Sequence, residues 1–153
     1  VGQFLAAWGG RKLHHAWLLA GPRGVGKASF AQAAARRVLA EAAGPPFDLP
    51  GLDVPPDHPM VRLIDAGSHP DHRWLERLPK EKGEGLARNI SVAQVRKLGE
   101  FLGMAPAMSA WRVVGIDAID DLEPAAANAL LKILEEPPAG TLFFLVSHTP
   151  GRL

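Results

Sequence analysis

The chain has 153 residues, of which 47% are hydrophobic and 22% are charged, and its formal net charge is +1. This composition predicts one ordinary cytoplasmic domain. It does not favour a nucleic-acid-binding or anionic-membrane surface, and no apolar run reaches the roughly 20 residues that a membrane span needs. The absence of cysteine excludes a disulfide framework, a thiolate zinc site and a cysteine nucleophile.

The first elements are predicted to be a buried strand and a helix. Residues 16–20 form a short apolar run that is typical of a parallel strand, and the turn-rich residues 21–26 follow it. From Lys27 to about residue 43 the chain is rich in alanine and lacks proline and glycine. This stretch predicts a helix that ends before Gly44.

Prolines dominate the next segment. Six of the 14 prolines lie in residues 44–59, a density that neither a helix nor a central strand tolerates. We expect a long loop here. Residues 61–64 suit either a short strand or a helix, residues 72–76 alternate as a strand does, and the charged residues 79–85 predict a surface loop.

The second half of the chain continues the alternation of helices and strands. Ser91 and Gln94 have the spacing of a capping box, at the start of a stretch in which apolar residues repeat every three or four positions. Helices are predicted over 90–102 and 124–135, and apolar strands over 111–116 and 141–146. This order predicts an α/β fold in which helices flank a parallel sheet in three layers.

A phosphate-binding loop is the most specific motif. Residues 21–27 (GPRGVGK) match the pattern GxxxxGK between a predicted strand and a predicted helix. Such a loop wraps backbone N–H groups around a phosphate, and its lysine adds a positive charge. The alternative is a glycine-rich turn with a solvated lysine. The candidate phosphate-binding residues are Gly21, Gly24, Gly26, Lys27 and Ser29.

Two positions that ATP hydrolysis requires lack their polar groups. Residue 28 is alanine, whereas the motif has a hydroxyl there that holds Mg²⁺. Asp117 ends a predicted strand, as the second Mg²⁺-binding acid of P-loop ATPases does, but Ala118 follows it and cannot orient water. Asp120 and Asp121 are interpreted as a helix-capping pair. We therefore expect weak or absent ATP and Mg²⁺ binding and no catalytic residue.

The six histidines are candidate metal ligands by residue type only. The pairs His14–His15 and His69/His72 have no third partner at ligand spacing. They are interpreted as surface histidines, and no metal site is expected.

With these motifs the chain resembles the ATPase domain of bacterial clamp loaders. The likeness rests on residues 15–19 (HAWLL), the loop that ends at Lys27, residues 66–71 (AGSHPD) and, above all, residues 126–138 (AANALLKILEEPP). It covers nearly the whole chain, and within the family it is strongest to the delta-prime branch of DNA polymerase III.

The resemblance implies an AAA+ P-loop NTPase domain in a five-subunit ring that opens a sliding clamp and places it on primed DNA with energy from ATP. The delta-prime branch is a stator with a degenerate site of its own. Ala28 and Ala118 fit it better than the gamma/tau motor branch, which is the alternative. The implied partners are the gamma/tau and delta subunits, the sliding clamp and primed DNA. We therefore expect a subunit of the DNA polymerase III holoenzyme that has no catalytic activity of its own.

Further expectations follow from the resemblance. Asn128, Lys132 and Glu135 form either a solvated helix face or a surface toward a neighbouring subunit. The proline-rich residues 44–59 stand where many relatives carry a four-cysteine zinc module, so no zinc is expected. The family continues into a segment with a trans-acting arginine, a lid and a collar. Residues 1–153 are therefore expected to be a truncated domain, and Arg152 is not that arginine.

Two other functions remain open from the residues alone. One is a small P-loop enzyme such as a kinase, against which Ala28 and Ala118 argue. The other is an autonomous nucleic-acid-binding module, against which the near-neutral charge argues.

Overall fold

The computed structural model describes residue 3 and residues 15–148 of the chain, and every element predicted within that range is present. No helix among these residues is long and apolar enough to cross a membrane. In chain order the elements are β1 (Ala16–Ala20), α2 (Lys27–Ala42), α3 (Pro59–Asp65), β2 (His72–Glu76), α4 (Val92–Leu102), β3 (Arg112–Asp117), the 3₁₀ turn η1 (Ile119–Asp121), α5 (Pro124–Glu135) and β4 (Thr141–Ser147).

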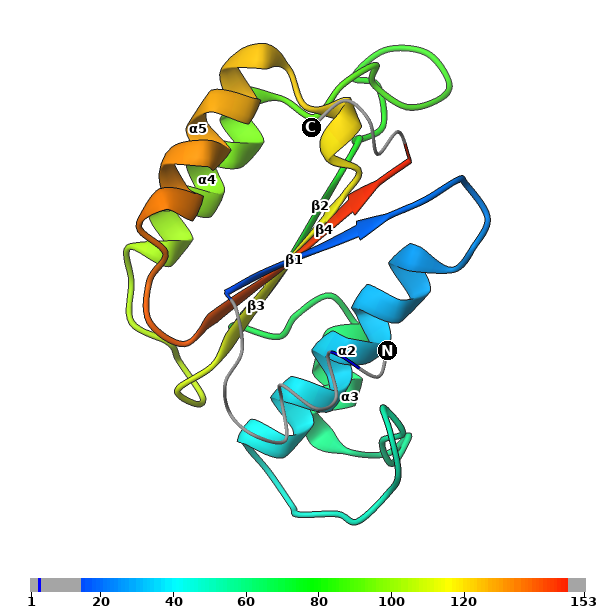
Figure 1. The fold of residues 1–153 in the computed structure, drawn as a ribbon, viewed down its shortest axis with the longest axis vertical. Coiled ribbons are helices and arrows are strands. Elements are labelled where there is room, and N and C mark those ends of the chain that lie inside the picture. The colour runs from blue at the N-terminus through cyan, green and yellow to red at the C-terminus, as the bar shows by residue number, and fades with distance from the viewer. Residues whose placement is uncertain (1–2, 4–14, 149–153) are drawn as a thin grey trace.

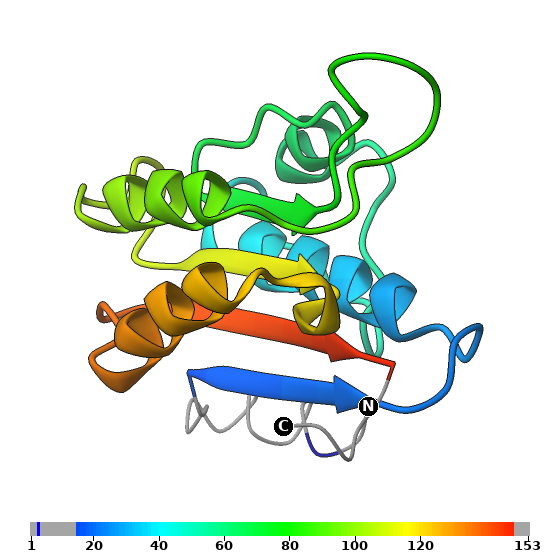
Figure 2. The ribbon, with the colours of Figure 1, turned by 90° about the horizontal axis from the view of Figure 1, so that it is seen from above.

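The four strands form one parallel sheet in the order β1-β4-β3-β2. Helices α4 and α5 cover one face of the sheet, and α2 and α3 cover the other (Figure 1). The view from above shows the strands side by side between these layers (Figure 2). The predicted three-layer α/β/α fold is therefore confirmed.

The alternation of side chains along the central strands divides the core into two halves. In β4, Phe143 and Leu145 pack toward α4 and α5, whereas Leu142 and Phe144 pack toward α2. In β3, Val114 joins the first half and Val113 the second. All of these side chains are buried, because a parallel sheet with helices on both faces has no solvated side.

Residues 61–64 belong to helix α3, so the helix is the correct alternative there. The helix begins inside the proline-rich segment, at Pro59. Pro59 occupies its first turn, where the missing N–H of proline is not needed. His58 caps the helix, since its Nδ1 accepts a hydrogen bond from the Met60 backbone N–H at 3.1 Å, and the ring nitrogen Nε2 lies 3.0 Å from the Pro45 carbonyl oxygen. The cap therefore ties both ends of the proline-rich loop together.

Arg37 on α2 organises the rest of that loop. Its guanidinium donates to the carbonyl oxygens of Leu49 at 2.7 Å and Asp53 at 2.8 Å, and to the Glu41 carboxylate at 2.8 Å. It also lies 5.0 Å from the centre of the Phe47 ring. One half-buried cation thus satisfies backbone carbonyls of a loop that has few hydrogen bonds of its own.

The expectation that the histidines lie at the surface is wrong for His58 and His69, and His72 is half-buried with its Nε2 atom buried. His58 and His69 are both 3% exposed, because each follows the same pattern: a histidine before a proline, whose Nδ1 accepts the N–H two residues on. His69 receives this bond from Asp71 at 3.0 Å. His14 lies outside the described residues.

Candidate nucleotide-binding site

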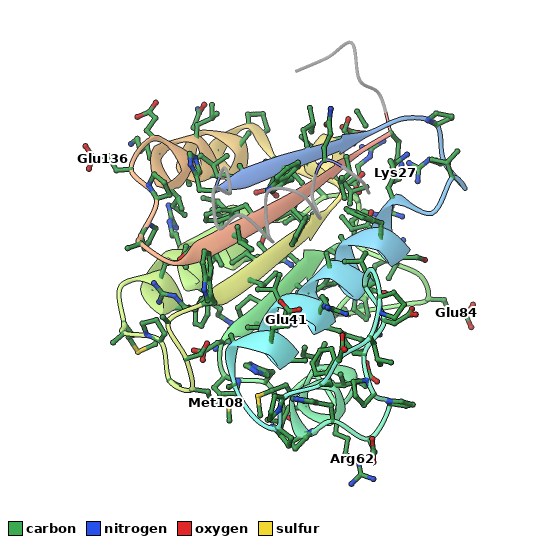
Figure 3. The ribbon with its side chains drawn as sticks, turned by 60° about the horizontal axis from the view of Figure 1, so that its bottom comes forward. Lys27, Glu41, Arg62, Glu84, Met108 and Glu136 are labelled. Atoms are coloured by element: carbon green, nitrogen blue, oxygen red, sulfur yellow. The ribbon has the colours of Figure 1, made fainter. Side chains whose placement is uncertain are left out.

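The phosphate loop lies where the carboxyl ends of the parallel strands meet. Strand β1 leads into the loop and α2 leaves it, and Figure 3 shows Lys27 at this end of the sheet. Such crevices beyond strand ends are where open α/β sheets bind ligands. A cavity of about 400 Å³ is present here, lined by Arg23, Gly24, Gly26, Lys27, Ala28, Ser29, Glu76, Arg77, Leu86, Asp117, Asp121 and His148.

The structure brings most of the predicted phosphate-binding residues together. Gly24 and Gly26 each have a φ of 84°, in the left-handed region that favours glycine, and no atom lies within 4 Å of where a Cβ would stand. The loop backbone is therefore open to a ligand. Gly21 does not line the cavity but receives a hydrogen bond from Lys27, whose ammonium also donates to the Pro22 carbonyl at 2.6 Å.

Ala28 places a methyl group in the cavity at the position of the motif's hydroxyl. Ser29, the next residue, is exposed and lines the same cavity. A serine at this position can hydrogen-bond an anion, but it is one residue away from the site that the motif uses for Mg²⁺.

Asp117 lies at the end of β3 and faces the cavity, as predicted. Its Oδ1 is 3.6 Å from Nε2 of His148, the residue that follows β4. The rule that located Asp117, a polar residue directly after an apolar parallel strand, also selects His148. The sequence prediction missed it because no motif includes a histidine there.

Asp120 and Asp121 have different structural roles. Asp121 accepts a hydrogen bond from the Ala118 backbone N–H at 3.3 Å, at the start of η1, and does not cap the helix that begins at Pro124. Asp120 instead accepts from the Ser147 hydroxyl at 2.8 Å and from the His148 backbone N–H at 2.7 Å. It therefore ties η1 to the end of β4, and the prediction that this pair caps the helix at Pro124 is wrong for both residues.

The donor set of the motif is incomplete for the Mg²⁺ ion that P-loop ATPases bind, because the hydroxyl at position 28 is absent. Mg²⁺ demands oxygen ligands in near-octahedral order, whereas position 28 offers a methyl group and the Asp117 carboxylate faces an imidazole. Among the described residues, no group of three or more histidine, aspartate and glutamate side chains could hold a metal ion.

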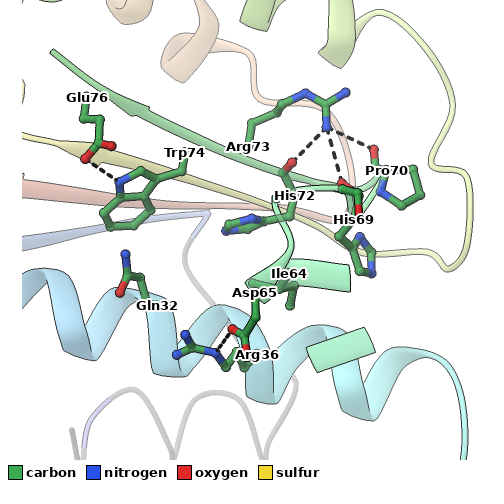
Figure 4. Close-up of a pocket in the computed structure, with 12 residues that line it drawn as sticks. Gln32, Arg36, Ile64, Asp65, His69, Pro70, His72, Arg73, Trp74 and Glu76 are labelled. Carbon is green, nitrogen blue, oxygen red and sulfur yellow. Dashed lines mark hydrogen bonds and ion pairs between the residues drawn. The ribbon is translucent and has the colours of Figure 1, made fainter. Parts of the chain in front are cut away.

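A larger cavity of about 890 Å³ lies away from the phosphate loop, between α2, α3 and the edge strand β2 (Figure 4). Its charged groups are already paired. Arg36 binds Asp65 at 2.8 Å, and Glu76 accepts from the Trp74 indole at 3.3 Å. Arg73 donates hydrogen bonds to backbone carbonyls, and its guanidinium carbon lies 4.0 Å from the centre of the Phe101 ring. We therefore place the candidate site at the phosphate loop.

The predicted interface residues lie on the outer side of α5. Asn128, Lys132 and Glu135 are all exposed, and Asn128 and Lys132 line a groove between α4 and α5 together with Arg96. Arg152 lies outside the described residues.

Comparisons with known proteins agree with this fold and loop. The family model described as "DNA polymerase III, delta subunit" matches residues 3–153. The chain is 38% identical to DNA polymerase III subunit delta' of Pseudomonas aeruginosa over 95% of its length and 41% of the relative's. It is 32% identical to subunit delta' of Escherichia coli, over 99% of its length and 42% of the relative's. It thus spans about two fifths of these relatives.

Similarity extends to a second class of subunit. The chain is 33% identical to DNA polymerase III subunit tau of Bacillus subtilis over 94% of its length and 23% of the relative's. A crystal structure of a gamma subunit-related protein of Thermotoga maritima has the same fold, with a TM-score of 0.63 at 19% identity over 99% of this chain and 40% of that one. The chain belongs to the DNA polymerase III delta' subunit family of clamp-loader proteins.

Proposed function

We propose that this chain acts as the delta-prime-type stator of a bacterial clamp loader and does not hydrolyse ATP at its own phosphate loop. The observation that carries the proposal is the pair of alanines at two positions where hydrolysis needs polar groups. Ala28 lines the phosphate cavity, and Ala118, directly after Asp117, is 1% exposed. Positioning and charge stabilisation account for almost all catalysis of phosphoryl transfer, so both gaps matter.

The neighbouring carboxylates support the same conclusion. Asp120 bonds to the end of β4, and Asp121 bonds to the Ala118 backbone. These two aspartates are the nearest candidates to replace the missing catalytic carboxylate. Each of them already holds a local hydrogen bond instead.

A motor role of the gamma/tau type is the second candidate. It is favoured by the intact glycines and Lys27 of the loop and by the 33% identity to a tau subunit. The two roles differ in one measurable property: a motor subunit turns over ATP within the assembled ring, whereas a stator does not.

The proposed partners are the gamma/tau and delta subunits, and through them the sliding clamp and primed DNA. Asn128, Lys132 and Glu135 are the proposed contact surface toward a neighbouring subunit. Their exposure on α5 supports this role, because exposed polar residues beside a groove can be buried by a partner without disturbing the core.

Co-purification tests the part of the proposed function that both candidate roles share, which is membership of a clamp loader. The full-length gene product, tagged and co-expressed with the delta and gamma/tau subunits of the same organism, is expected to elute with them as one complex. Lys132→Glu is expected to weaken this complex. Arg62→Glu is the matched control, because Arg62 is exposed on α3, on the other face of the sheet. Elution of the unmodified protein alone would contradict the proposal.

A further inference from the structure

His148 stands beside Asp117 at the place where a P-loop ATPase gathers its metal ligands. The imidazole Nε2 lies 3.6 Å from the carboxylate, and the histidine side chain is 16% exposed. Both side chains line the cavity that contains Gly24 and Lys27. An imidazole is a good ligand for zinc or copper but a poor one for Mg²⁺.

The position of His148 is fixed by the fold. Its backbone N–H donates to Asp120 at 2.7 Å, and the preceding residue, Ser147, donates its hydroxyl to the other oxygen of the same carboxylate at 2.8 Å. Ser147 is fully buried at the end of β4. These bonds hold the backbone of His148 at the end of β4, beside Asp117.

The cavity also contains the protein's own cationic side chains. Arg23, Lys27 and Arg77 line it together with His148, and so do the carboxylates of Glu76, Asp117 and Asp121. Arg77 reaches Asp121, with Nε 4.0 Å from Oδ2. A polyphosphate entering this space would meet backbone N–H groups and cationic side chains without the help of a divalent ion.

We propose that the phosphate loop of this chain binds polyphosphate independently of divalent metal, with His148 beside Asp117 in place of a metal ion. This inference rests on the proposed function, in which the loop does not hydrolyse ATP. The ligand chemistry is a chain of phosphates, which either a nucleotide or an inorganic polyphosphate supplies.

Equilibrium binding to the full-length protein tests the proposal. A fluorescent ATP analogue is titrated in excess Mg²⁺ and in excess EDTA, and the expected dissociation constants agree within about twofold. Competition by unlabelled ATP and by inorganic tripolyphosphate separates the two ligand sources: equal competition indicates recognition of phosphates alone, and stronger competition by ATP indicates a nucleotide site. Metal independence itself is decided by the comparison of the dissociation constants in Mg²⁺ and in EDTA.

Three variants sharpen the test. Lys27→Ala is expected to weaken binding at least about tenfold under both conditions. The double variant Ala28→Thr with His148→Asn restores oxygen ligands and is expected to bind more tightly in Mg²⁺ than in EDTA. Arg36→Gln is the matched control, because Arg36 pairs with Asp65 in the other cavity. Melting temperatures of each variant with and without tripolyphosphate report binding independently of the fluorescent label.

Two results would overturn the inference. One is binding by the unmodified protein that is lost in EDTA, and the other is no binding under either condition. Neither result affects the co-purification test above, so a failure of this inference is distinguishable from a failure of the proposed function.

Discussion

The indole ring of Trp74 on β2 occupies the space into which a side chain at Gly115 on β3 would project. A Cβ at Gly115 would lie 2.2 Å from the nearest ring carbon, and the two residues are direct partners in the parallel register. A glycine in a buried strand commonly marks such a close approach. The pair therefore fixes the edge strand β2 against β3, whose last residue is Asp117.

Gly115→Ala is expected to destabilise the protein by about 1–3 kcal/mol, because the added methyl forces the indole or the strand to move. Chemical denaturation followed by circular dichroism measures the change. Gly99→Ala is the matched control: Gly99 lies within α4 with open space around it, and alanine there is expected to stabilise the helix by up to about 1 kcal/mol. Equal effects of the two substitutions would contradict the described packing.

Arg37→Lys is expected to loosen the proline-rich loop and to cost about 1–3 kcal/mol, since an ammonium cannot reproduce the guanidinium bonds to Leu49, Asp53 and Glu41. Hydrogen exchange of the amides between residues 47 and 58 is expected to accelerate, while exchange in α5 stays unchanged. Arg36→Lys, which affects a single half-exposed ion pair, is expected to cost less than about 1 kcal/mol. Unaltered loop exchange in Arg37→Lys would show that another contact holds the loop.

The free energy of unfolding is expected to decrease as the pH falls, because His72 has a lower pKa in the folded chain than in the unfolded chain. Burial, assisted by the charges of His69, Arg73 and Arg36, lowers the pKa of His72 from 6.5 to about 4. Between pH 6.5 and about pH 4, His72 is therefore protonated in the unfolded chain but neutral in the folded chain. Stability present above pH 6.5 is lost as the pH falls toward 4, by up to about 3 kcal/mol.

Denaturation of His72→Gln between pH 7 and pH 4 is expected to show a weaker pH dependence than the unmodified protein. A smaller dependence remains, because burial also lowers the pKa of His69. Identical pH profiles of the two proteins would refute the assignment to His72.

Asp120→Asn is expected to destabilise the carboxyl end of β4 by about 1–3 kcal/mol, because an amide offers only one acceptor oxygen to the Ser147 hydroxyl and the His148 N–H. Asp121→Asn is the matched control with a smaller expected effect, since its bond to the Ala118 N–H is longer, at 3.3 Å. Thermal melting of both variants makes the comparison. A larger loss in Asp121→Asn would reverse the roles given to the two carboxylates.

The sequence predicted the layers of the fold and the phosphate loop because both depend on local pattern. Apolar runs such as 141–146 and the capping box of Ser91 and Gln94 are readable along the chain, and the structure confirms them. The helix at Pro59 was less clear, because its cap is His58, and histidine is not among the residues that usually cap helices.

Features that join distant segments could not be predicted in this way. The contact of His148 with Asp117 depends on β3 and β4 being neighbours in the sheet. The role of Arg37 depends on how a loop of prolines folds back onto α2. Both arise from tertiary packing, which no spacing rule within one segment describes.

Reconstitution of the clamp loader tests the central claim most directly. The full-length protein is assembled with delta and gamma/tau subunits, and DNA-stimulated ATP hydrolysis is measured with Lys27→Ala in this chain. We expect a rate within about twofold of the unmodified complex, whereas the same substitution in the gamma/tau loop abolishes hydrolysis. A loss of about tenfold or more from Lys27→Ala would contradict the stator role and identify this chain as a motor.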